Sequence, residues 1–146
     1  MRIVNKKFRI YKIGFTLTEL LVVMIIVGIM TTLALPMFVK TIEKAKLGEA
    51  GTNLNLIRTG EKIYYLDLGY FSGTGTAEDP IGKLNIENPN TATSAYFTYT
   101  IETAAGLTSD FTARAQRKNT APNPYSTYYY EIKKSGDITS NGPLKP

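Results

Sequence analysis

The chain opens with a segment that is apolar almost without interruption. Residues 20–35 read LLVVMIIVGIMTTLAL, and residues 15–17 and 37–39 extend this run on both sides. The whole stretch carries one charged side chain, Glu19. A helix of roughly 20 apolar residues is long enough to cross a bilayer. The pattern therefore predicts a membrane-spanning helix over residues 15–39.

The helical pattern continues beyond the apolar stretch. Over residues 40–68, apolar side chains recur at steps of three and four residues, which is typical of one face of an amphipathic helix. Gly69 is a residue that commonly follows the last turn of a helix, so we expect the helix to end near Leu68. The predicted buried face consists of Leu47, Ala50, Leu54, Ile57, Glu61, Tyr64 and Leu68.

Three later segments have the composition of strands. They are rich in aromatic and β-branched residues and are bounded by Gly, Pro, Asn and Asp. Their close spacing favours an antiparallel meander, and residues 135–139 suggest a turn with a short final strand. The predicted strands cover residues 95–101, 111–117 and 128–133.

These elements predict an α+β fold. A small antiparallel sheet needs a helix to cover its apolar face. We expect residues 40–68, the second half of the long helix, to pack on a β-rich head formed by residues 69–146.

Charge is distributed unevenly along the chain. The formal net charge is +5, but the first 14 residues hold five basic side chains and no acidic one, and the remainder is balanced. The basicity therefore gives no argument for nucleic-acid binding. Basic residues before an apolar span predict a cytoplasmic N-terminus, with the head on the outer side of the membrane. The basic residues are Arg2, Lys6, Lys7, Arg9 and Lys12.

The composition also limits the chemistry that the protein can perform. The chain contains no cysteine and no histidine, which excludes disulfides and thiol catalysis and removes the commonest general base. Gly73-Thr74-Gly75 lacks the Lys-Ser/Thr of a phosphate-binding loop. We therefore expect no enzymatic activity.

The apolar run and the residues after it argue against a simple secretory signal peptide. The apolar run is longer than the roughly 7–15 residues of such a signal, and Ala34-Leu35-Pro36 is not a small-residue cleavage site. A plain signal anchor would explain hydropathy and charge equally well. It would not explain an acid such as Glu19 inside the apolar run, because such residues usually have a partner and a role.

Residues 12–19, Lys-Ile-Gly-Phe-Thr-Leu-Thr-Glu, followed by an apolar run, resemble the class III signal of type IV prepilins and type II secretion pseudopilins. The resemblance extends over about residues 9–46 and includes Gly28 and Pro36. It implies that a membrane prepilin peptidase removes residues 1–14 by cutting between Gly14 and Phe15, and then methylates the new amine of Phe15. The pilin resemblance also implies the same α+β architecture.

The resemblance assigns an assembly role to Glu19. Cleavage creates an ammonium group at Phe15, and pairing it with a carboxylate offsets the cost of placing either charge in apolar surroundings. Glu19 could pair with the amine of its own chain or with that of a neighbouring subunit, and the sequence leaves both arrangements open. Gly28 and Pro36 weaken the helix between them, which is either a site of unwinding in the filament or a simple kink.

Two binding sites in the head are alternatives with weaker support. Major pseudopilins, which this chain resembles, often hold calcium near the C-terminus, but Asp137 and Asn141 offer a single carboxylate where calcium takes about six to eight oxygens. Asp79-Pro80-Ile81-Gly82 matches a family loop only faintly. We expect no cofactor, with calcium as the alternative. A DNA-binding patch, also not expected, would use Arg114, Arg117, Lys118, Lys133 and Lys134 beside Tyr128, Tyr129 and Tyr130.

Together these observations predict a structural subunit that polymerises through its N-terminal helix into a type IV pilus or a type II secretion pseudopilus. Its expected partners are prepilin peptidase, membrane lipid, an inner-membrane assembly platform and other pilin copies. Its expected location is the bacterial inner membrane, and then a periplasmic or surface filament. The alternatives are a minor pilin that binds DNA or a surface, and an anchored protein that never polymerises.

Overall fold

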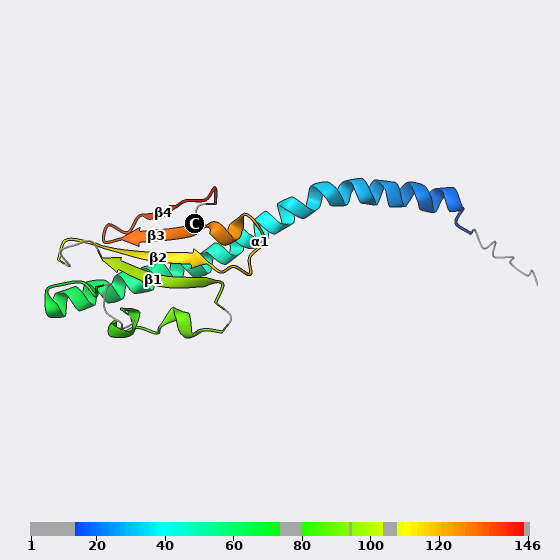
Figure 1. Ribbon diagram of the computed structural model, residues 1–146. Coiled ribbons are helices and arrows are strands. Elements are labelled where there is room, and N and C mark those ends of the chain that lie inside the picture. The colour runs from blue at the N-terminus through cyan, green and yellow to red at the C-terminus, as the bar shows by residue number, and fades with distance from the viewer. Residues whose placement is uncertain (1–13, 74–79, 94, 104–107, 145–146) are drawn as a thin grey trace, which may run out of the picture. The chain divides into compact units, whose positions relative to one another are not determined.

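The computed structural model describes residues 14–73, 80–93, 95–103 and 108–144 of the 146-residue chain (Figure 1). Two units are distinguished by their internal contacts, Met1–Val39 and Lys40–Pro146. The second unit, called the head below, contains all four strands.

One helix, α1, runs from Leu17 to Leu68. It contains both Gly28 and Pro36 without an interruption in its assignment. Gly69 has a φ of 79° and its N–H donates to the carbonyl of Tyr65 at 2.8 Å, so it closes the last turn in the left-handed conformation that suits glycine. The predicted end of the helix is confirmed.

The head contains one sheet of four antiparallel strands in the order β1-β2-β3-β4, which confirms the predicted meander. The strands are β1 (Phe97–Thr103), β2 (Phe111–Arg117), β3 (Tyr129–Lys133) and β4 (Ile138–Ser140). The first begins two residues later than predicted, because the N–H of Tyr96 bonds to the side chain of Glu49 on α1 instead of to a strand.

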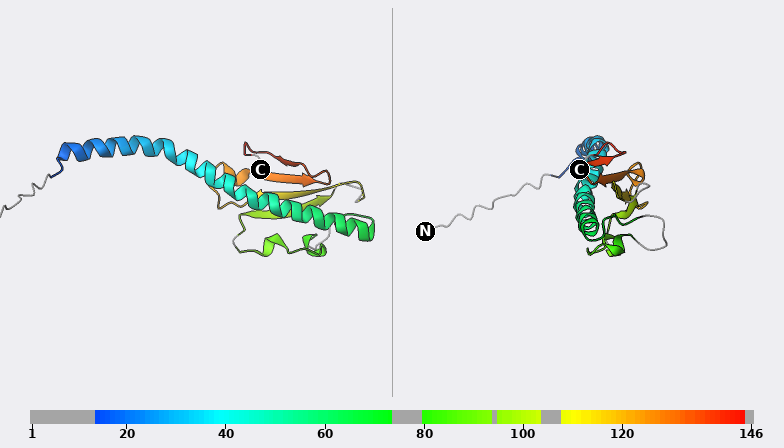
Figure 2. Two further views of the ribbon diagram at one scale, coloured as in Figure 1. Left: turned by 180° about the vertical axis from the view of Figure 1, so that it is seen from behind. Right: turned by 90° about the vertical axis from the view of Figure 1, so that its left-hand side faces the viewer.

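The core lies between one face of this sheet and α1, as the two views of Figure 2 show. Alternate residues of β2 point inward, with Ala113 and Ala115 leaving room for the helix. From α1 the core receives Leu47, Ala50, Leu54 and Ile57, and from the strands Phe97, Tyr99, Ile101, Phe111, Tyr130 and Ile132.

The predicted buried face of the helix is correct in its middle and wrong at its end. Leu68 is 50% exposed and lies in the last turn of α1, next to Gly69. Glu43 and Gly60 are buried although the pattern did not include them. Gly60 packs closely there, since a Cβ would lie 3.0–3.3 Å from the side chains of Leu84 and Ile86, which would have to shift to admit it.

The segment between α1 and β1 contains two short 3-10 helices, Ile81–Lys83 and Pro89–Thr91. Asn90 joins this segment to β1 through both ends of its amide. Its Nδ2 donates to the carbonyl of Tyr99, and its Oδ1 accepts from the N–H of Tyr99, each at 2.8 Å.

Candidate functional site

The start of α1 is organised around Glu19. One carboxylate oxygen, Oε2, accepts hydrogen bonds from the N–H of Thr16 at 2.8 Å and from its hydroxyl at 2.7 Å. The hydroxyl of Thr16 in turn accepts from the N–H of Glu19 at 3.3 Å. This is a capping box, in which the side chain of Glu19 accepts from the backbone N–H of Thr16 and the side chain of Thr16 accepts from the backbone N–H of Glu19. The Thr-x-x-Glu signature stands in the sequence, although our sequence reasoning considered only charge pairing for Glu19.

The capping box uses one oxygen of the carboxylate. All hydrogen bonds to Glu19 from the described residues fall on Oε2, so Oε1 can accept from a further cation. Phe15 still carries an amide nitrogen here, because the chain is uncut. The predicted partner of Glu19, an ammonium group at Phe15, exists only after cleavage.

The predicted cleavage position lies just outside the helix. Gly14 and Phe15 are exposed and precede the first residue of α1. A Cβ placed on Gly14 would meet nothing within 4 Å, so the fold itself does not require glycine there.

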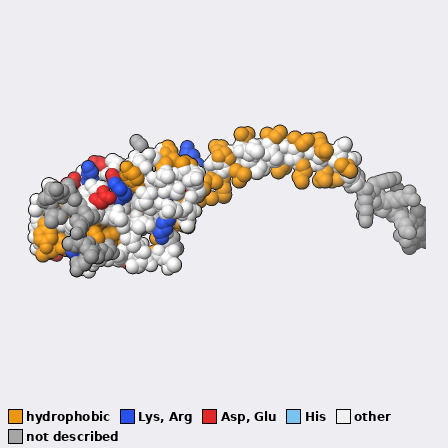
Figure 3. Space-filling view, viewed as in Figure 1, with side chains coloured by type: hydrophobic (Ala, Val, Ile, Leu, Met, Phe, Trp, Pro, Cys, Tyr) orange, Lys and Arg blue, Asp and Glu red, His pale blue; other side chains and the backbone are white. Residues whose placement is uncertain are grey.

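The first part of α1 is long and apolar enough to cross a membrane. Its side chains are exposed along residues 15–38, and Figure 3 shows hydrophobic groups along this segment. The hydroxyls of two threonines near its middle have partners in the helix itself, since Thr31 donates to the carbonyl of Val27 and Thr32 to that of Ile29, each at 2.7 Å. An unsatisfied donor would be costly in lipid.

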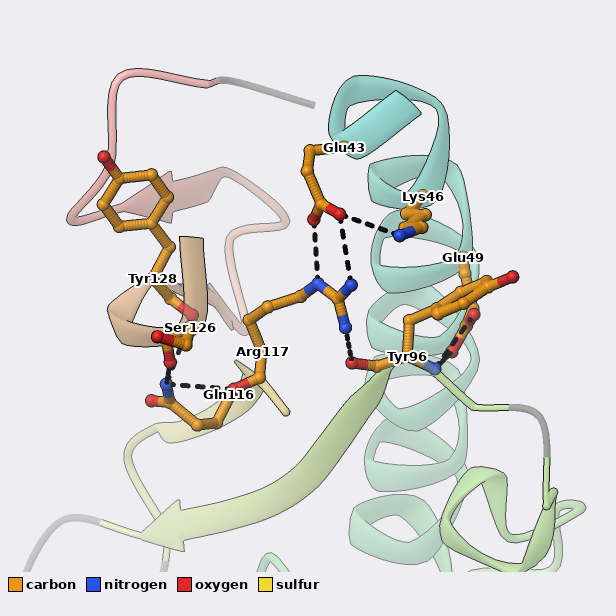
Figure 4. A network of polar contacts seen from close by, with 8 residues as sticks. All are labelled: Glu43, Lys46, Glu49, Tyr96, Gln116, Arg117, Ser126 and Tyr128. Atoms are coloured by element: carbon orange, nitrogen blue, oxygen red, sulfur yellow. Dashed lines mark hydrogen bonds and ion pairs between the residues drawn. The ribbon is translucent and has the colours of Figure 1, made fainter. Parts of the chain in front are cut away.

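Within the head, a buried ion pair joins the end of β2 to the part of α1 that follows Val39 (Figure 4). The guanidinium of Arg117, at the end of β2, donates to both carboxylate oxygens of Glu43 at 2.9 and 3.3 Å, and to the carbonyl of Tyr96 at 2.6 Å. Lys46 donates to the same carboxylate at 2.8 Å. Both Glu43 and Arg117 are 4% exposed.

This arrangement controls the charge of Glu43. Burial raises the pKa of the carboxyl, but hydrogen bonds and positive charge from Arg117 and Lys46 outweigh burial and hold the pKa below its usual value. The carboxylate is therefore the form that the folded head stabilises.

A second buried carboxyl, that of Glu61, is hydrogen-bonded to the segment that follows α1. It accepts hydrogen bonds from the N–H of Ser72 at 3.0 Å and from the hydroxyl of the same residue, and it is fully buried. Burial raises the pKa of Glu61, and the bonds from Ser72 offset this only in part. These contacts attach the segment after α1 to the helix.

Two of the five basic residues of the DNA-binding alternative are paired with carboxylates, whereas Lys133 and Lys134 are exposed. Arg117 is buried against Glu43, and Arg114 pairs with Glu131 at 2.7 Å and with Glu102 at 3.2 Å. The ammonium group of Lys134 lies 5.3 Å from the ring centre of Tyr65.

Within the described ranges, no group of three or more acidic or histidine side chains is placed to hold a metal ion. Asp137, the carboxylate of the calcium alternative, lies in the turn before β4. Part of the loop in the second calcium motif, Asp79, falls outside the described residues. The expectation of no cofactor stays a prediction.

Comparison with known proteins gives three similarities. Residues 11–35 match the family described as the prokaryotic N-terminal methylation motif. The chain is 39% identical over 59 residues to the type IV major pilin protein PilA of Myxococcus xanthus, covering 40% of this chain and 27% of that protein. It is 37% identical over 89 residues to a fimbrial protein of Moraxella nonliquefaciens, covering 54% of this chain and 58% of that protein.

The chain thus spans less than two thirds of the length of either relative. Among solved structures, the non-core minor pilin PilV of Neisseria meningitidis has a similar fold, with a TM-score of 0.51 and 22% identity over 73% of this chain and 93% of that one.

The matched motif contains the junction that the sequence analysis singled out, from Gly14 to Glu19. The helix and four-stranded sheet of this chain, together with the similar fold of that minor pilin, confirm the predicted α+β fold. The chain therefore carries the prokaryotic N-terminal methylation motif at the start of a long helix, and it is similar to type IV pilins in part of its sequence and to a minor pilin in its fold.

Proposed function

We propose that this chain is a structural, non-enzymatic subunit that is cut between Gly14 and Phe15 by prepilin peptidase, methylated at Phe15, and polymerised through its N-terminal helix. The observation that carries the proposal is the geometry of the junction. Gly14 and Phe15 are exposed and non-helical, and the helix that follows begins with a charged cap in an otherwise apolar segment.

The proposal gives Glu19 a role at each stage. In the uncut chain Thr16 supplies its hydrogen bonds, so the helix is capped and the acid is satisfied near the membrane surface. After cleavage, the new ammonium group at Phe15 of the same or another copy supplies a cation for Oε1. The charge pair then offsets the desolvation of both groups inside a filament.

The names of the relatives support a pilus over a secretion pseudopilus, since one is a type IV major pilin and the other a fimbrial protein. The basic residues that precede the apolar helix support an initial location in the inner membrane with the head outside. Assembly with other pilin copies on an inner-membrane platform then follows from the proposed function.

The test is mass spectrometry of the N-terminus of the protein purified from its own membrane. We expect a mature chain that begins at N-methylated Phe15. The matched variant Gly14→Leu should keep the start of the chain at Met1, because its fold is unchanged while the peptidase substrate is altered. A wild-type chain that keeps Met1, in cells shown to contain active prepilin peptidase, would refute the proposal and leave a plain membrane anchor.

A second variant separates assembly from processing. Glu19→Val should be cut and methylated but should not enter sheared filaments. Abundant filaments from that variant would show that the charge pair is not needed for assembly.

A further inference from the structure

The first turns of α1 after the apolar stretch are rich in lysine. Residues 40–46 contain Lys40, Lys44 and Lys46, with one acid, Glu43, among them. Lys40 directly follows Val39, the last residue of the apolar stretch, so it lies where a membrane-spanning helix reaches the lipid headgroups. Lys40 and Lys44 are one helical turn apart, and both are exposed. Their ammonium groups can therefore reach a partner at the membrane surface.

Folding brings further cationic and aromatic groups to this end of the head. The ion pair of Arg117 with Glu43, at 2.9 Å, places the end of β2 beside these turns of the helix, and Lys118 is the next residue (Figure 4). The N–H of Lys118 donates to the carbonyl of Tyr96 at 3.1 Å. Tyr96 is 44% exposed, and the ammonium group of Lys46 lies 4.8 Å from its ring centre. Tyrosines and long cationic side chains are typical of the headgroup level of membrane proteins.

Positive charge is in excess at this end and not elsewhere on the head. Residues 40–146 hold 12 basic and 11 acidic side chains, and five of the basic ones lie here beside two acids, Glu43 and Glu49. In the described chain, no carboxylate pairs with Lys40, Lys44 or Lys118. The surface, called the basic end below, consists of Lys40, Lys44, Lys46, Arg117 and Lys118.

The position of the basic end is opposite to the usual distribution of charge around a membrane helix. Short segments on the outer side of such a helix normally contain few Lys and Arg residues. In the proposed mature chain residues 1–14 are gone, so all basic side chains that flank the apolar helix lie on its outer side. Anionic lipid headgroups attract clusters of lysine beside a membrane helix.

We infer that the basic end is a docking surface for the headgroups of anionic phospholipids in the outer leaflet of the membrane that the helix crosses. Lys40, Lys44 and Lys118 bind the lipid phosphates, and Tyr96 lies at the same level. The inference rests on the proposed function, which puts the head outside and removes the basic leader. It adds a lipid contact that holds the head against the bilayer before the subunit enters a filament.

Fluorescence quenching in lipid nanodiscs tests this contact. The chain has no cysteine, so Asn119→Cys, next to Lys118, carries a single fluorophore. Full-length chains are placed in nanodiscs of phosphatidylcholine alone or of an equal mixture with phosphatidylglycerol, each with the same small share of a lipid whose headgroup carries a spin-label quencher. We expect phosphatidylglycerol to raise the quenching at least about twofold, since each lysine near an anionic surface favours docking about fivefold. A label at Asp67→Cys, in the last turn of α1, should not respond.

Removal of the lysines provides the second measurement. The triple variant Lys40→Gln, Lys44→Gln and Lys118→Gln should lose the increase in quenching, because three lysines together favour docking about a hundredfold. The wild type should lose it in about 1 M salt, where the screening length is about 3 Å. A matched control that removes three exposed lysines from other parts of the head should keep the increase. The control variant combines Lys62→Gln, Lys83→Gln and Lys133→Gln.

Equal quenching in both lipid mixtures, or an increase that survives in the triple variant, would overturn the inference. An increase of the same size at both labels would also overturn it, because the whole head and not its basic end would then approach the bilayer. A label at Asn119 that responds to duplex DNA instead of to phosphatidylglycerol would assign the surface to a different partner and overturn it too. These outcomes leave the proposed function intact, since N-terminal processing and filament yield decide that function separately.

Discussion

Replacing Arg117 by methionine should destabilise the head strongly. The substitution removes three hydrogen bonds, two to Glu43 and one to the carbonyl of Tyr96. That carbonyl keeps the N–H of Lys118 at 3.1 Å, but Glu43 is left with Lys46 alone in a site where it is 4% exposed. Removing one partner of a buried ion pair typically costs about 3–5 kcal/mol. Because Lys46 remains, we expect a loss of about 3 kcal/mol.

Urea unfolding of the full chain in detergent micelles measures this loss. The protein has no tryptophan, and nine of its ten tyrosines lie at or beyond Tyr64, so tyrosine fluorescence reports on the head. With a slope of about 1.5–3 kcal/mol per molar urea, a loss of about 3 kcal/mol lowers the midpoint by about 1–2 M.

Two controls separate the charge from the packing. The double variant Glu43→Met with Arg117→Met should recover most of the loss, because both charges leave the interior together. Glu102→Gln removes a half-exposed partner of Arg114 and should cost less than about 1 kcal/mol. A double variant as unstable as Arg117→Met alone would refute the reasoning, because packing and not charge would then hold the contact.

The pH dependence of the wild type carries the same information. The pKa of Glu43 is lowered in the folded head, so the stability from this group is present above the unfolded value near 4.5 and is lost as the pH falls through the folded value. In Arg117→Met the carboxylate is the penalised form. The deficit of the variant should therefore shrink as the pH is lowered below about 4.5. An undiminished deficit at acid pH would contradict the assignment.

Two further predictions concern other contacts of the head. Burial raises the pKa of Glu61. The contribution of this carboxyl to stability is therefore complete below the unfolded pKa near 4.5 and is lost as the pH rises toward the folded pKa. Glu61→Gln should lack this loss of stability, which urea titrations at several pH values would reveal. Gly136→Ala should destabilise the head by at least about 1 kcal/mol, because φ is 101° and the new Cβ would lie 2.7 Å from the guanidinium of Arg58. Gly51→Ala, with open space around it in a helix, should instead raise the urea midpoint of unfolding. Equal effects of the two alanines would contradict this reasoning.

The parts of the fold that sequence could predict are those with local signals. The apolar run, the three- and four-residue spacing and the glycine at the helix end predicted α1 to within two residues at each end, and alternation predicted β2. The prediction that Leu68 is buried was wrong, because the spacing of apolar residues continues to the last turn of the helix whether or not that turn is covered.

The contacts that hold the head together had no such signal. Glu43 and Arg117 are 74 positions apart, and each reads as an ordinary surface charge until the sheet brings β2 to the helix. Arg117 even counted as a candidate for binding DNA, since sequence shows a charge but not its neutralising partner. The capping box of Thr16 and Glu19 was different, because its signal is local and was passed over in favour of the charge pairing that the family resemblance suggested.

The amide of Asn90 has a consequence for how the sheet of one chain can meet the sheet of another. An open strand edge is a template on which other chains can add strands and aggregate. Asn90 occupies the N–H and carbonyl of Tyr99 in the middle of β1, and the opposite edge, β4, is only three residues long. Neither edge of the sheet offers a long row of free backbone groups among the described strands. The head is therefore protected at the described strand edges from joining the sheet of another copy.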